Sequence, residues 1–211
     1  MNVFHAIFCY GPHNHLLQKQ CQLVRDLLGF QPVRQVVYYG QHTDVARCGI
    51  ETHVVGVREC YENLPLKTYG LILHALQDNQ WDVLLKTDVN SKIGYFDANR
   101  VAKQDLTGYC GRRNPDKRQI MLNYHKNRVS ESLFQEDWKG TEPSSWVGGP
   151  AYTISRRLAE YIASKGAWWA RSWPYEDIMV SFAADEMGSP ASGGIGYYSD
   201  QDKFSKLHRN H

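Results

Sequence analysis

The first half of the chain alternates strand-like and helix-like segments, and this alternation constrains the fold more than any other feature. Runs rich in β-branched and aromatic residues predict strands at residues 3–11, 33–40, 51–57 and 81–85. Apolar residues at helical spacing predict helices between them, at residues 15–29 and 63–77. Strands that alternate with helices build layered folds. We therefore predict an α/β fold with a mostly parallel central sheet flanked by helices.

The second half of the chain is less regular. We predict a strand at residues 106–113 and a helix at residues 156–166. Residues 187–200 are rich in Gly and Ser and predict a flexible loop. A length of 211 residues is enough for one domain with a sizeable core.

The charges are nearly balanced, with 24 basic and 22 acidic residues and a net charge of +2. This balance gives no general attraction to nucleic acid or to membrane surfaces. The five cysteines contain no Cys-x-x-Cys pair, which favours a reducing compartment over a disulfide framework. No apolar run is long enough to span a membrane. We expect a soluble, cytoplasmic protein, and the chain could be one module of a longer polypeptide.

The segment WDVLLKTDVN at residues 81–90 ends an apolar strand in two oxygen-bearing side chains, Asp88 and Asn90. Ligands of parallel sheets bind beyond the carboxyl ends of the strands. In an extended chain, residues two apart point the same way, so both oxygens could meet one ion. Such hard ligands suit Mn²⁺ or Mg²⁺. A polar turn after a strand is the alternative interpretation.

Four further segments accompany this one in order: YENLPLKT at residues 61–68, YCGRR at 109–113, SSWVGGPAYTIS at 144–155 and YEDIMVS at 175–181. The ordered set resembles the β-1,3-galactosyltransferase-like glycosyltransferases, and it is similar to glycosyltransferase modules of multi-domain chlorella-virus proteins. The resemblance implies a GT-A (Rossmann-like) fold as a single domain over residues 1–211. Its nucleotide-binding half would span about 1–100 and its acceptor half about 101–211. A viral origin would place it in the host cytoplasm.

The resemblance also implies a reaction. A hexose or deoxyhexose would pass from a UDP-sugar donor to a carbohydrate or glycan hydroxyl, with Mn²⁺ or Mg²⁺. Asp88 matches an aspartate that lies against the nucleoside and the metal, and Asn90 matches an aspartate that binds the metal directly. The neutral Asn90 departs from the pattern and is a weaker ligand, so we expect a third metal ligand, His208 near the carboxyl end.

Other residues are candidates for donor binding. The end of the first strand, Tyr10 and Gly11, is where this fold places the nucleoside, although Tyr10 could equally belong to the core. Gly148 and Gly149 permit close approach of a sugar to the backbone, or simply form a turn.

Two lysines could face the phosphates of the donor. Lys67 fits the lysine of the family's helix start, and Lys206 lies close to His208 in sequence. Lysines on helices and near chain ends are more commonly solvated, and this is the alternative for both.

Glu176 and Asp177 are the catalytic candidates, because they match the Glu-Asp pair of the family. In an inverting enzyme one carboxylate removes the proton of the acceptor hydroxyl. In a retaining enzyme it would bind hydroxyl groups of the donor or acceptor. Acidic residues are also favoured at the start of any helix.

Two other functions stay open. A metal-dependent nucleotidyltransferase also uses carboxylates beside a sheet, but it releases pyrophosphate rather than UDP. A catalytically silent relic of the fold, which only binds carbohydrate or nucleotide, would be consistent with the neutral Asn90.

Overall fold

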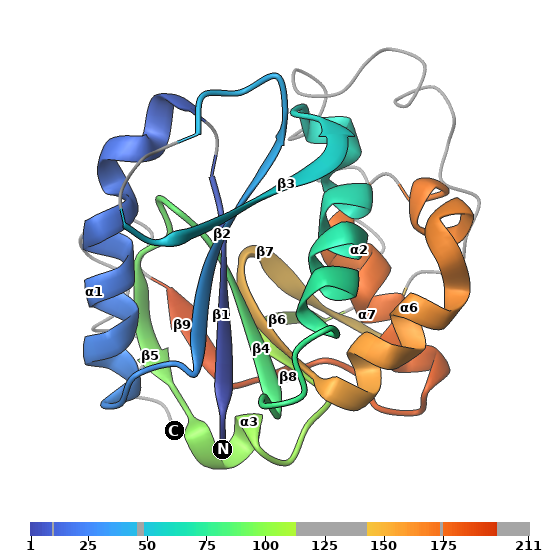
Figure 1. Cartoon of the computed structure of the whole chain (residues 1–211). Helices are drawn as coiled ribbons and strands as arrows, with labels where there is room; N and C mark the ends of the chain where they lie inside the picture. Colours follow the sequence, from blue (N-terminus) through green and yellow to red (C-terminus); the bar gives the residue numbers. More distant parts are fainter. Residues whose placement is uncertain (10, 46–48, 113–142, 174, 198–211) are drawn as a thin grey trace.

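The computed structural model describes residues 1–9, 11–45, 49–112, 143–173 and 175–197. A seven-stranded sheet with the order β3-β2-β1-β4-β7-β6-β8 runs through its centre (Figure 1). Its strands are β1 (Val3–Phe8), β2 (Arg34–Gln41), β3 (Glu51–Arg58), β4 (Val83–Asp88), β6 (Leu106–Arg112), β7 (Ser145–Ser155) and β8 (Ser192–Gly193). A smaller sheet pairs β5 (Ile93–Phe96) with β9 (Ile195–Tyr197) in antiparallel fashion.

The first four strands of the sheet, β3, β2, β1 and β4, are all parallel, whereas β7 runs antiparallel to both β4 and β6. Phe8 at the end of β1 pairs with Tyr38 of β2 and with Asp88 of β4. The carboxyl ends of these strands therefore form one edge, and the predicted α/β fold with a mostly parallel sheet is confirmed.

Helices cover both faces of the sheet. They are α1 (Leu17–Leu28), α2 (Leu64–Ala75), α3 (Ala98–Val101), α6 (Arg156–Arg171) and α7 (Glu176–Glu186), with short 3₁₀ segments η1 (Gly11–Leu16) and η2 (Tyr61–Asn63). In Figure 1, α1 lies on one side of the sheet, and α2, α6 and α7 gather on the other side. Every residue of β1 is buried between these layers, which is typical of a central parallel strand.

The sequence pattern explains α1. Its buried face includes Leu17, Cys21 and Val24, which recur at helical spacing. The helix ends where Gly29 adopts a φ of 71° and donates its N–H to the Arg25 carbonyl at 3.0 Å. Glycine adopts this left-handed conformation without a steric penalty.

Two sequence predictions need correction. Residues 192–197 of the predicted flexible loop form β8 and β9, because their backbones pair with β6 and β5. The predicted helix at 156–166 continues to Arg171, with a break at Gly166, where φ is 83°. In the described part of the chain, no helix combines the length and apolar character that crossing a membrane requires.

Candidate active site

A buried lysine is the centre of the site at the carboxyl edge of the sheet. Lys86 of β4 has a side chain that is only 1% exposed. Its Nζ donates to Asp88 Oδ1 at 2.7 Å, to the Gly149 carbonyl at 2.6 Å and to Glu176 Oε1 at 2.6 Å. An ammonium group has three N–H donors, so these contacts satisfy it completely. Lys86 therefore links the carboxyl end of β4 to the middle of β7 and to the start of α7.

Glu176 is held from three directions. Lys86 occupies its Oε1, while its Oε2 accepts from Thr68 Oγ1 of α2 at 2.5 Å and from the Tyr152 hydroxyl of β7 at 3.3 Å. Burial raises the pKa of Glu176, and the Lys86 cation opposes this rise. Burial lowers the pKa of Lys86, but Asp88 and Glu176 together raise it above its ordinary value, so the ammonium stays charged.

The neighbouring Asp177 is less buried than Glu176. It is half-buried in the first turn of α7, and its Oδ1 accepts the N–H of Ile178 at 3.0 Å. Among the described residues, the only donors to the Asp177 carboxylate are two backbone N–H groups, those of Ile178 and of Asp177 itself. Burial, and then the charge of Glu176, raise the pKa of Asp177 to about 7. A carboxyl group with this pKa exchanges its proton near neutral pH.

Gly149 lies against both carboxylates. A Cβ added to Gly149 would be 3.5 Å from Glu176 Oε1 and 3.6 Å from Asp177 Oδ2. Gly148 precedes it in β7. The structure thus brings four predicted residues together, Asp88, Gly149, Glu176 and Asp177.

A second buried lysine lies next to this cluster. Lys67 Nζ donates to both carboxylate oxygens of Glu59, at 2.9 and 2.8 Å, and to the Cys9 carbonyl at 3.2 Å. The ring of Phe8 separates the two lysines, with its centroid 4.8 Å from Lys67 Nζ and 4.7 Å from Lys86 Nζ. Burial lowers the pKa of Lys67, and the charge of Glu59 opposes this. The expected role of Lys67 toward a diphosphate stays a prediction.

The proposed metal ligands lie at the end of β4. Val89 and Asn90 form a turn, closed by the Ser91 N–H donating to the Asp88 carbonyl at 3.0 Å, so Asn90 is not part of an extended strand. Asp88 is half-buried and Asn90 is exposed. No group of three or more His, Cys, Asp or Glu residues in the described ranges is arranged to hold a metal. The expectation that both side chains point the same way therefore does not hold, because it assumed an extended chain. The Asp88 carboxylate is the kind of ligand that Mg²⁺ takes together with substrate phosphates and water, and the contribution of Asn90 stays a prediction.

The loops after β1 and β2 are tied together at the same edge. The N–H of Gly11 donates to Thr43 Oγ1 at 2.9 Å, and Asn14 Nδ2 donates to the Asp44 carbonyl at 3.0 Å. Three residues that the sequence analysis singled out, Tyr10, Lys206 and His208, lie outside the described residues.

Sequence reasoning missed Lys86, Thr68 and Tyr152. Lys86 carried a usable signal, since a lysine inside the apolar run VLLKTD must be buried, and buried lysines need anionic partners. Thr68 and Tyr152 lay inside quoted motifs, but their contacts with Glu176 join residues that are 108 and 24 positions apart. Nothing local in the sequence reveals such contacts.

Comparison with known proteins shows the family of this chain. The galactosyltransferase family model matches residues 53–192, which is more than half of the chain. Among curated proteins, none matches the sequence. The chain belongs to the galactosyltransferase family, as its motifs predicted.

A solved structure with a TM-score above 0.5 shows the same fold at low sequence identity. Glucosyl-3-phosphoglycerate synthase from Mycobacterium tuberculosis, in complex with Mn²⁺, UDP and phosphoglyceric acid, gives a TM-score of 0.51 at 10% identity, over 98% of this chain and 73% of that chain. A glycosyltransferase involved in glycosylation of the major capsid of PBCV-1 gives a TM-score of 0.48 at 10% identity, over 92% and 82% of the two chains. Family and fold together define a glycosyltransferase with the GT-A fold.

Proposed function

We propose that this chain transfers a hexose or deoxyhexose from a UDP-sugar to a carbohydrate hydroxyl, with Mn²⁺ or Mg²⁺ held by Asp88 and Asn90. The observation that carries the proposal is Asp177, a half-buried carboxylate with a pKa near 7 at the carboxyl edge of the sheet. A solved structure with this fold was obtained in complex with Mn²⁺ and UDP, which supports this choice of donor and metal.

In this reaction Asp177 acts as the general base. It accepts the proton of the acceptor hydroxyl while the hydroxyl oxygen forms a bond to C1 of the sugar. The bond between C1 and the diphosphate oxygen breaks, and UDP leaves with the electron pair. A base whose pKa is close to the working pH suits this task. A bound divalent ion would stabilise the negative charge that grows on the leaving diphosphate.

The other predicted contacts belong to the same proposal. The nucleotide-binding half covers about residues 1–100, and the acceptor half covers the rest of the domain. Residues proposed to hold the donor or the metal are Tyr10, Gly11, Lys67, Gly148, Gly149, Lys206 and His208. The nucleoside would lie beyond β1 and β2, where the Gly11–Thr43 hydrogen bond joins the two loops.

Calorimetric titration of UDP in the presence of Mn²⁺ tests the donor and metal site. Asp88→Ala should abolish Mn²⁺-dependent UDP binding, because it removes the charged oxygen ligand at the strand end. Asn90→Asp should tighten binding by adding a charge. Asp26→Ala, which removes an exposed aspartate of α1, should bind as the wild type does. Unchanged UDP affinity in Asp88→Ala would reject the metal site.

Product analysis tests the reaction itself. The wild type should release UDP from a UDP-sugar, and Asp177→Asn should lower the rate by about a hundredfold or more, the scale of a lost general base. Release of pyrophosphate would instead identify a nucleotidyltransferase. Mn²⁺-dependent UDP binding without any turnover would identify a silent relic of the fold.

A further inference from the structure

Glu176 and Asp177 are adjacent in the sequence, yet their carboxylates are used very differently. Both oxygens of Glu176 accept hydrogen bonds from buried donors on other elements. Among the described residues, the Asp177 carboxylate accepts hydrogen bonds only from the backbone N–H groups of Ile178 and of Asp177 itself, and from no side chain. A general base needs an oxygen that can accept the proton of the substrate. Asp177 meets this requirement, whereas Glu176 would first have to break its bonds to Lys86 or Thr68.

We propose that Glu176 and Lys86 form a positioning pair for the Asp177 carboxylate, and that Glu176 takes no part in the proton transfer. The inference rests on the proposed transferase reaction, in which Asp177 is the base.

The contacts show how the pair acts on Asp177. Glu176 fixes the first turn of α7 to β4 through Lys86 and to α2 through Thr68. Lys86 also binds the carbonyl of Gly149, the residue that lies beside Asp177 Oδ2. The two bonds of Glu176 are buried and the bond to Gly149 is partly buried, and together they fix the place from which Asp177 projects.

A second tie holds the same turn. Ser181 Oγ donates to the Asp177 carbonyl at 2.6 Å and accepts the Val147 N–H of β7 at 3.2 Å. The backbone of Asp177 is therefore anchored to β7 independently of Glu176. Loss of the Glu176 contacts should disturb the Asp177 side chain without detaching the helix.

The pair also sets the charge around Asp177. The charged groups that act on it are Glu176 from its own segment and Lys86 from β4. Two tyrosines face it as well, and its charge raises the pKa of Tyr175 and of Tyr152. After burial, Glu176 is the main cause that raises the pKa of Asp177, and Lys86 lowers it. The two members of the pair therefore act on the proton affinity of Asp177 in opposite directions.

Carbon-13 NMR titration of the aspartate carboxyl groups tests the inference without any substrate. Asp177→Asn identifies the Asp177 signal by its loss. Glu176→Gln should move the Asp177 midpoint to lower pH by about one unit, and Lys86→Met should move it to higher pH by about one unit. The controls, Glu160→Gln and Lys165→Met, change exposed or half-exposed ion pairs of the surface and should leave the signal in place.

Lys86→Met leaves a buried carboxylate without its counter-ion and could fail to fold. The double variant Lys86→Met/Glu176→Gln is neutral at both positions and provides the second test. Its Asp177 midpoint should return to within about half a unit of the wild-type value, because two opposite shifts cancel. Midpoints that stay at the wild-type value in Glu176→Gln, or that move the same way in both single variants, would overturn the inference.

Activity provides the complementary readout. Glu176→Gln should keep kcat within about tenfold of the wild type at its own optimum pH, with the acidic limb of the kcat/KM profile displaced to lower pH. Asp177→Asn should lose about a hundredfold or more at every pH. A Glu176→Gln loss as deep as that of Asp177→Asn would assign the proton transfer to Glu176 and overturn the inference. A wild type that turns over no UDP-sugar would reject the proposed function, and the titration would still decide the positioning role.

Discussion

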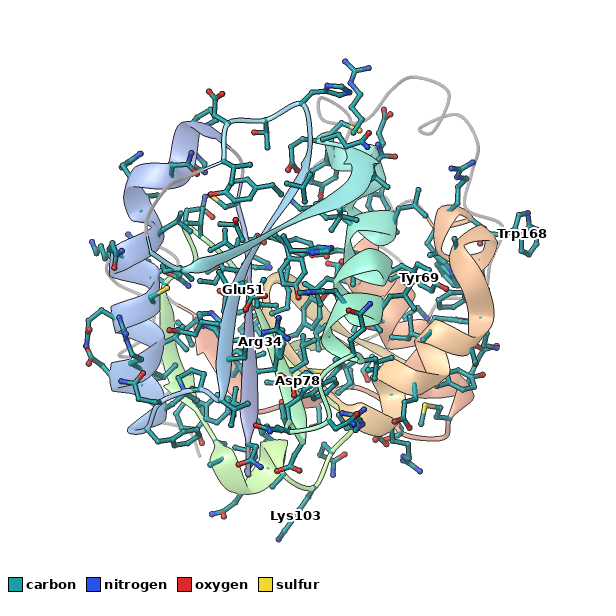
Figure 2. All side chains as sticks on the ribbon, viewed as in Figure 1. Arg34, Glu51, Tyr69, Asp78, Lys103 and Trp168 are labelled. Atoms are coloured by element: carbon teal, nitrogen blue, oxygen red, sulfur yellow. The ribbon has the colours of Figure 1, made fainter. Side chains whose placement is uncertain are left out.

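The cluster around Lys86 and the cluster around Arg34 place similar charges at opposite ends of the parallel strands. Lys86 lies near the end of β4 with its side chain 1% exposed, and Glu176 beside it is 6% exposed. Arg34 begins β2 and pairs with Glu51 of β3, with side chains that are 31% and 41% exposed. Figure 2 shows Arg34, Glu51 and Asp78 together, and Arg34 Nη1 lies 3.6 Å from Asp78 Oδ2.

The difference in exposure decides what each cluster can do. Water and salt screen the Arg34 pair, so its net contribution to stability is small. The charges of Lys86 and Glu176 are barely screened, so each one depends on its partners and shifts the pKa of its neighbours. A buried network of this kind suits a site where proton affinity must be set, and the exposed pair does not.

Removal of Lys86 should give the largest change in stability. Lys86→Met leaves Glu176 buried without a counter-ion, and we expect it to lower the free energy of unfolding by about 3–5 kcal/mol. Urea denaturation measures the loss. Lys165→Met, which removes a half-exposed partner of Glu186, should cost less than about 1 kcal/mol. A Lys86 variant as stable as this control would show that the buried cluster contributes no more to the free energy of unfolding than a surface pair does.

A buried histidine, His5, adds a case in which the hydrogen-bond partners are neutral. His5 is fully buried in β1, with its ring nitrogens 3.0 Å from Thr87 Oγ1 and from Gln35 Nε2. Burial, and then the charge of Arg25, lower the pKa of His5 to about 3. The folded protein therefore binds fewer protons than the unfolded chain below pH ~6.5, the ordinary value for histidine.

The contribution of His5 to stability should be complete above pH ~6.5 and decline as the pH falls toward 3. We expect His5 to contribute a slope of about 1.4 kcal/mol per pH unit across this window, and the raised pKa of Asp177 to contribute a slope of opposite sign. Urea denaturation between pH 6.5 and 5, above most carboxyl pKa values, measures it. His5→Gln should change the slope from the wild-type value by about 1.4 kcal/mol per pH unit, because only the His5 contribution is lost. His15→Gln, which changes an exposed histidine, should keep the wild-type slope. Equal slopes in all three proteins would show that the ring does not stay neutral in the fold.

The exposed pair should give the smallest effect. Arg34→Gln and Glu51→Gln should each lower the free energy of unfolding by about 0.2–1 kcal/mol, because both partners regain water when they separate. The difference from the wild type should shrink further in 1 M salt. A double-mutant cycle at low and high salt measures the coupling. A coupling as large as that of Lys86 with Glu176 would remove the contrast between the two clusters.

Local sequence patterns were sufficient to predict much of the fold and the family of this protein. The order of strands and helices in the first half and the ordered motifs of the family could be read directly. Weak local signals failed in the second half, where short strands at residues 192–197 exist only because β5 and β6 are available to pair with them. The long strand β7 was missed for a related reason, since its glycines and Pro150 lower any local strand preference.

The sequence by itself determined the fold class and the family, and it singled out Asp88, Glu176 and Asp177 as candidate site residues. It could do so because periodicity and motif order are properties of the chain. Only the tertiary structure decided how the two adjacent carboxylates differ. Burial of Glu176 between Lys86 and Thr68 depends on β4, α2 and α7 packing together. Desolvation and hydrogen bonding act over a few ångströms in space, whereas these partners are 90 and 108 residues away along the chain.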